Sequence, residues 1–125
     1  MDEDTLSHRI IGASIEVHRN LGPGLLESIY ETALEMELNE SGLQVRRQME
    51  LPVLYKGKRL EGGYRVDLVV ENLVIVEIKA VERLLPLFES QLLTYLKLSG
   101  MKLGLLINFN SSVVSNSVRR VVNKL

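Results

Sequence analysis

A run of eight residues, VIVEIKAV at positions 74–81, constrains the fold of this chain more than any other stretch. Every side chain in it is valine, isoleucine or alanine except Glu77 and Lys79. Such a run is typical of a strand at the centre of a sheet with both faces covered. It therefore predicts a layered fold around a buried sheet, and the two charged side chains inside the strand need an explanation of their own.

The chain has 125 residues, the size of one ordinary domain, and we expect residues 1–125 to form a single domain. No apolar run approaches the roughly 20 residues of a membrane helix. The acidic start MDEDTLSH lacks the basic and apolar parts of a secretory signal, so we expect a cytoplasmic location. Because there is no cysteine and only two histidines, any bound metal is expected to have oxygen ligands.

The net charge of −1 hides an uneven distribution of charged residues. Residues 1–41 carry nine acidic and two basic side chains, whereas residues 42–125 carry seven acidic and thirteen basic ones. The basic excess of the second part suits a polyanion such as nucleic acid, but it suits an ordinary solvated surface as well.

Local patterns divide the chain into helices and strands. Apolar residues at helical spacing predict helices over residues 5–20, 25–41, 86–98 and 113–124. β-Branched and alternating residues predict strands over residues 44–55, 59–71, 73–81 and 102–108. The first two strands flank the turn KGK and are expected to form a hairpin. This order predicts an α/β (α+β) fold with a four-stranded mixed sheet flanked by helices.

Glu77 and Lys79 point to one face of their strand, because residues two apart lie on the same side. Asp67, inside the apolar run YRVDLVV, lies on the neighbouring strand within reach of that face. Two carboxylates so close repel each other unless a cation or a proton intervenes. A magnesium ion held by Asp67 and Glu77 resolves this conflict, and Lys79 would then assist a water or a phosphate oxygen. A buried ion pair of Lys79 with either carboxylate explains the same spacing without chemistry.

The second predicted helix carries several acidic residues. Glu27 lies at the edge of its apolar stripe, beside Tyr30 and Leu34, and is expected to point inward. Ordinary surface positions are expected for Glu31, Glu35 and Glu37.

On the helix predicted over residues 86–98, Gln91 and Tyr95 are one turn apart and share a face. Either both reach the polar site, or Tyr95 is a core residue and Gln91 is exposed. His18, just before a Gly-Pro-Gly turn, is expected to cap or pack against its helix and not to take part in catalysis.

Taken together, these segments resemble the small bacterial proteins named for a GxxExxY motif, a group of the PD-(D/E)xK nuclease superfamily. The motif stands here as GLLESIY at residues 24–30, within the longer match NLGPGLLESIYETAL. The likeness continues through YRVDLVV, VIVEIKAVERLLP, QLLTYL and GLLINF, and extends from about residue 8 to residue 122. The motif alone is a weak pattern, but its combination with an Asp strand, a Glu-x-Lys strand and a Gln-containing helix in this order is specific.

The resemblance implies a restriction-endonuclease-like αβββαβ core. It implies that Asp67 and Glu77 bind the metal, Mg²⁺ or Mn²⁺, and that Lys79 is the catalytic lysine. It further implies that Glu27 is an additional acid near the metal, with a catalytic or metal-binding role, and that Gln91 supports catalysis from the following helix. The proline that often precedes the aspartate is absent here, where Arg65-Val66 precedes Asp67. Many members of the superfamily lack this proline.

Three functions are compatible with these residues. The first is a metal-dependent nuclease that hydrolyses phosphodiester bonds in DNA, with basic walls around the site. The second is a nucleic-acid- or protein-binding module on the same fold that does not cleave, a reading that the few aromatic residues and the pI of 6.1 favour. The third is a structure-specific nuclease for branched DNA that acts as a homodimer, because paired cuts need two sites.

Overall fold

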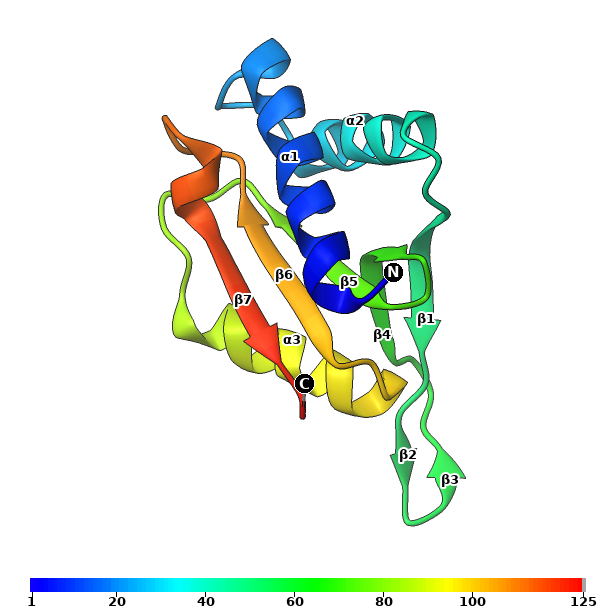
Figure 1. Cartoon of the computed structure of the whole chain (residues 1–125). Coiled ribbons are helices and arrows are strands. Elements are labelled where there is room, and N and C mark those ends of the chain that lie inside the picture. The colour runs from blue at the N-terminus through cyan, green and yellow to red at the C-terminus, as the bar shows by residue number, and fades with distance from the viewer. Residues whose placement is uncertain (125) are drawn as a thin grey trace.

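A computed structural model of the chain describes residues 1–124. A five-stranded mixed sheet lies between helices on its two faces (Figure 1). The helices are α1 (Glu3–Leu21), α2 (Glu27–Glu40) and α3 (Pro86–Ser99), with a short 3-10 helix η1 (Val114–Ser117). The strands are β1 (Val45–Leu51), β2 (Leu54–Tyr55), β3 (Lys58–Arg59), β4 (Tyr64–Val70), β5 (Val74–Lys79), β6 (Leu103–Asn108) and β7 (Val118–Val122). Within residues 1–124, no helix is both long and apolar enough to span a membrane.

The helices begin and end where the sequence provides caps. The Asp2 carboxylate accepts a hydrogen bond from the Thr5 N–H at 2.8 Å and so caps the start of α1. Helix α3 begins at Pro86, whose missing N–H costs nothing in a first turn, and ends at Gly100, which takes the left-handed conformation with a φ of 76°.

The sheet has the strand order β1-β4-β5-β6-β7, and only the β5–β6 pair is parallel. Helix α3 makes the crossover that a parallel pair requires. Strand β5 is the middle strand of the five, and its residues Val74 to Ile78 are buried. The prediction of a central, doubly covered strand at VIVEIKAV is confirmed.

Two apolar clusters cover the faces of this strand. In the first, Ile10 of α1 and Leu34 of α2 pack together with Val76. In the second, Leu96 of α3 packs together with Ile75. Adjacent residues of β5 thus belong to opposite layers, as the alternation of side chains along a strand requires.

Two details of the predicted fold are wrong. The segment predicted as a helix over residues 113–124 is the short helix η1 followed by strand β7, which pairs antiparallel with β6 and gives the sheet a fifth strand. The β-branched valines of VRRVV favour this extended conformation. The predicted hairpin is interrupted, because β1 and β4 pair directly while the small β2–β3 hairpin projects beyond them (Figure 1). The mixed sheet flanked by helices is confirmed and is consistent with a restriction-endonuclease-like fold.

Candidate active site

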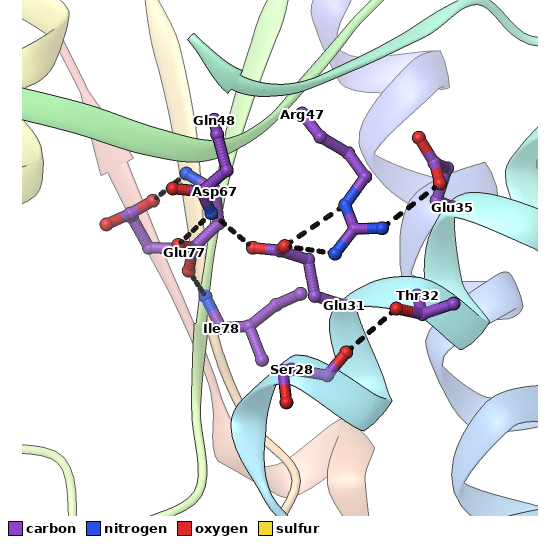
Figure 2. Close-up of polar contacts among 9 residues, drawn as sticks. All are labelled: Ser28, Glu31, Thr32, Glu35, Arg47, Gln48, Asp67, Glu77 and Ile78. Atoms are coloured by element: carbon purple, nitrogen blue, oxygen red, sulfur yellow. Dashed lines mark hydrogen bonds and ion pairs between the residues drawn. The ribbon is translucent and has the colours of Figure 1, made fainter. Parts of the chain in front are cut away.

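The candidate site lies where strands β4 and β5 stop pairing. Their antiparallel register ends at the pair Leu68 and Val76, just before Asp67 and Glu77. Beyond that point, hydrogen bonds from backbone N–H groups to side-chain carboxylates connect the two strands. The Asp67 N–H donates to Glu77 Oε2 at 2.7 Å, and the Ile78 N–H donates to Asp67 Oδ2 at 2.8 Å. Each carboxylate is therefore fixed by the backbone of the opposite strand (Figure 2).

The regular alternation of side chains between the two faces of the sheet is interrupted in β4 at Asp67. Val66 packs in the cluster beneath α3, whereas Leu68 packs in the cluster beneath α1 and α2, although residues two apart share a face in a regular strand. The β1–β4 register skips Asp67 together with Gln48, whose φ of 52° is uncommon for a residue other than glycine. The distortion places the Asp67 side chain at the boundary between the two layers, and local backbone strain of this kind concentrates at functional sites.

Glu31 joins the site from helix α2. Its side chain is buried, with a relative exposure of 6% for the residue. Arg47 Nη2 donates to Glu31 Oε2 at 2.6 Å, and Gln48 Nε2 donates to Glu31 Oε1 at 2.9 Å. The same Gln48 nitrogen lies 3.4 Å from Asp67 Oδ1, so Gln48 links Glu31 to Asp67 (Figure 2). Arg47 is shared with Glu35, whose oxygen lies 3.5 Å from Arg47 Nη1.

The surface position predicted for Glu31 is therefore wrong. The sequence carried a signal for it, since Glu31 follows Glu27 by one helical turn and shares its face. It also lies directly beside the buried Tyr30 and three residues before the buried Leu34. What the sequence lacked was the partner, because Arg47 and Gln48 come from β1 and meet Glu31 only through the tertiary fold.

Glu27 and Lys79 lie near the end of β5. The inward orientation predicted for Glu27 is wrong, because the residue begins α2 and is exposed. Its Oε2 accepts a hydrogen bond from the Ala80 N–H at 2.9 Å. It thus contacts the backbone next to Lys79, and no hydrogen bond joins it to Asp67 or Glu77 within the described residues. Lys79 is half-buried, with its ammonium 4.6 Å from the centroid of the Phe88 ring at the start of α3. This cation–π contact holds the ammonium on the α3 side of the strand end.

Gln91 and Tyr95 divide between two environments. Tyr95 is buried, and its ring lies 5.2 Å from the ring of Tyr64. Burial, followed by the negative charges of Glu77 and Asp67, raises the pKa of Tyr95 to about 12. Gln91 is exposed and lines a hollow beside the site, where it forms no hydrogen bond with any residue of 1–124.

Comparison with known protein families agrees with this geometry. A family model described as PD-(D/E)XK nuclease superfamily matches residues 4–121. The chain belongs to the PD-(D/E)XK nuclease superfamily. Nucleases of this superfamily generally use divalent metal ions. Separate searches of curated proteins and of solved structures gave no significant match. The finer placement in the GxxExxY group stays a prediction.

The surroundings of the carboxylate pair shift the pKa of both carboxyl groups upward. Burial raises the pKa of Glu77 to about 8, and the negative charge of Asp67 contributes to this shift. Burial likewise raises the pKa of Asp67 to about 6, with the Glu31 charge adding to the shift and the Ile78 N–H opposing it. At pH 7 the pair therefore retains one proton, carried by Glu77, because burial and the nearby Asp67 charge disfavour a second negative charge.

The donor chemistry of the pair fits an oxygen-preferring divalent cation. Mg²⁺ is usually held by one or two protein carboxylates, with waters and substrate phosphates completing its shell. Asp67 and Glu77 supply two carboxylates. A bound cation would compensate their negative charges in place of the proton on Glu77. Within residues 1–124, no three side chains of histidine, cysteine, aspartate or glutamate are grouped as a ready-made metal centre.

Proposed function

We propose that this chain is a divalent-metal-dependent nuclease that hydrolyses phosphodiester bonds in DNA. The observation that carries the proposal is the Asp67–Glu77 pair, a half-buried and a buried carboxylate that are each fixed to the backbone of the opposite strand. A buried pair of like charges destabilises a fold unless a counter-charge compensates it. A cation required for activity explains why the chain keeps the pair, and membership of the nuclease superfamily supports the reaction class.

In this proposal, Asp67 and Glu77 hold Mg²⁺ or Mn²⁺. When bound, the ion supplies Lewis acidity, which lowers the pKa of a water and neutralises charge on the scissile phosphate. Glu77 gives up its proton as the site is loaded, since a carboxylate must be deprotonated to act as a ligand. The hydrogen bonds from the Asp67 and Ile78 N–H groups keep both side chains at the gap between β4 and β5.

Lys79 is the proposed catalytic lysine. Lys79 follows Glu77 by two residues at the end of β5 and is half-buried. Its ammonium lies over the Phe88 ring. From this position it is suited to donate a hydrogen bond to a phosphate oxygen, stabilising the negative charge that develops as the nucleophile attacks.

The remaining residues position these groups. Glu31 orients Asp67 through Gln48. Glu27 fixes the backbone after Lys79 through the Ala80 N–H, and it stays the additional acid of the proposal. Gln91 takes its supporting role on the substrate side, since it lines the hollow next to Phe88.

A cleavage assay tests this function. The labelled panel comprises linear duplex, single strand, flap, four-way junction and RNA, each with Mg²⁺, Mn²⁺ or chelator. We expect metal-dependent cutting by the wild type and loss of cutting in Asp67→Ala, Glu77→Gln and Lys79→Met. Cutting that survives in a folded Asp67→Ala protein would refute the assignment. Cutting confined to the four-way junction by a dimer would support the branched-DNA function instead.

A second candidate is a module that binds nucleic acid without cleaving it. It is favoured by the hydrogen bonds that already occupy one oxygen of Asp67 and one of Glu77, since these bonds hold the pair without a metal. A folded wild type that binds the panel but cuts none of its members above the Asp67→Ala background would support this candidate.

A further inference from the structure

The aromatic residues of this chain are distributed unevenly. Of its two Phe and four Tyr, Tyr30 and Phe109 stack on each other in the core with ring centroids 4.7 Å apart. The others lie beside α3 or on the β2–β3 hairpin: Phe88, Tyr95, Tyr64 and Tyr55. The Phe88 ring contacts the Lys79 ammonium, so one ring of this group lies next to the proposed catalytic lysine.

A hollow of about 340 Å³ is lined by Phe88 and Tyr64. Its remaining wall comes from α3 and includes Leu87, the amide of Gln91 and the hydroxyl of Thr94. Leu87 is 71% exposed, and Tyr64 is 37% exposed although its ring also contacts buried Tyr95. Aromatic and apolar walls with a free amide at one edge match a nucleobase, which has two π faces and a hydrogen-bonding rim.

A second hollow, of about 300 Å³, adjoins the first and shares Tyr64 with it. Arg59, Arg65 and Glu50 line it, together with the Gly62-Gly63 link between the hairpin and β4. Residues 52–65 contain four basic side chains and one acidic side chain. No salt bridge joins Arg59 or the hairpin lysines to any residue of 1–124. The Arg65–Glu50 pair, at 3.2 Å, is exposed on both sides and therefore weak.

We propose that a single-stranded nucleic-acid segment lies along these two hollows, with one unpaired base between Tyr64 and Phe88 and with phosphates along Arg59 and the hairpin. Stacking platforms beside a basic groove are how proteins hold single strands. The proposal rests on the function proposed above and specifies its substrate, a nucleic acid with an unpaired strand next to the scissile bond. A regular duplex does not satisfy the first hollow, because its bases are already stacked and must be flipped out to enter.

Binding is measured in the Asp67→Asn protein, so that a failure of cleavage does not affect the result. The probes are a single-stranded 20-mer containing 2-aminopurine, the same 20-mer as a duplex, and a flap of the same length. We expect the single strand and the flap to bind about 10-fold more tightly than the duplex, with 2-aminopurine fluorescence quenched by stacking on Tyr64.

An added Tyr64→Leu substitution is expected to weaken single-strand binding about 5- to 50-fold, as loss of a stacked base does. Gln91→Ala should weaken it about 2- to 10-fold, because it removes one hydrogen bond to the base. Lys58→Gln should weaken it less and reduce its salt dependence. Arg19→Gln is the matched charge control, because it lies at the end of α1, away from the hairpin (Figure 1). Equal or tighter binding of the duplex, or single-strand binding unchanged in folded Tyr64→Leu and Gln91→Ala proteins, would overturn the proposal. Tight single-strand binding without cleavage by the wild type would overturn only the nuclease function.

Discussion

Asp67 and Glu77 occupy positions that a stable core would give to apolar residues. The adjacent residues Leu68 and Val76 on the same two strands are fully buried apolar side chains. Where the β4–β5 hydrogen-bond ladder ends, the two carboxylates accept the hydrogen bonds that backbone carbonyls would otherwise accept. Glu77 keeps its proton at neutral pH, because burial and the nearby Asp67 charge raise its pKa. At the scale of single residues, the chain keeps two carboxylates at a cost in stability, which the proposed cation would offset.

The raised pKa of Glu77, about 8 against an ordinary value of 4.5, predicts a pH dependence of stability without metal. The folded state keeps this proton longer than the unfolded state, so the stabilising contribution is complete below about pH 4.5 and is lost as the pH rises through about 8. We expect the free energy of unfolding in chelator to fall between pH 5 and pH 8, by at most about 1.4 kcal/mol per pH unit.

The Glu77→Gln variant supplies the control for this titration. Glutamine still accepts from the Asp67 N–H but carries no charge, so the variant should unfold at a higher temperature than the wild type at pH 8 and show a shallower slope. Thermal unfolding followed by circular dichroism measures both effects. A wild type whose stability rises over the same pH range would contradict the protonated pair.

Glu31 and Glu35 offer a matched comparison, since both pair with Arg47 and only Glu31 also binds Gln48. We expect Glu31→Gln to lower the cleavage rate about 10-fold, the typical effect of losing a residue that orients a metal ligand. Glu35→Gln should stay within about 2-fold of the wild type, because it does not touch the link to Asp67. Equal losses in both variants would indicate that Arg47, and not the orientation of Asp67, is what matters.

At the scale of elements, most of the fold was predictable from apolar spacing and turn residues. Helices α1, α2 and α3 and the buried strand β5 follow patterns strong enough to determine their type. Strand β7 was not predictable, because VSNSVRRVV fits helical and strand periodicity almost equally, and pairing with β6 decides the outcome. The position of Glu77 and Lys79 within one buried strand was predictable from the run VIVEIKAV, and their roles stay predictions. The contact of Glu31 with Gln48 was not predictable, because it forms only where β1 meets α2.

The packing of α3 on β6 gives a prediction at this scale. A Cβ added to Gly104 would lie 2.8 Å from two side-chain carbons of Leu92, closer than real contacts allow. We expect Gly104→Ala to destabilise the protein by about 1–3 kcal/mol through overpacking. Gly12→Ala is the control, because no atom lies within 4 Å of its added Cβ in α1 and alanine should stabilise that helix by about 0.5–1 kcal/mol. Chemical denaturation of both variants checks the pair, and a stable Gly104→Ala protein would show that α3 is loosely packed.

At the scale of the whole molecule, the sheet separates two helical layers and its central strand ends between them. Helices α2 and α3 lie on opposite faces of the sheet (Figure 1). Helix α2 carries Glu27, which contacts the Ala80 N–H, and α3 carries Phe88, which contacts the Lys79 ammonium. The hollows and the basic hairpin continue from the α3 side. In the proposed function, the acidic pair, the lysine and the two hollows together form the substrate-binding side of the molecule.

The most direct test of the carboxylate pair as a metal site is a calorimetric titration of the full-length wild type with Mn²⁺. We expect saturable binding that is accompanied by proton release at pH 7, because the cation displaces the proton held by the pair. Asp67→Asn and Glu77→Gln should lose this binding, whereas Glu35→Gln should keep it. Absence of saturable binding by the wild type, or binding that persists unchanged in Asp67→Asn, would contradict a metal site at Asp67 and Glu77.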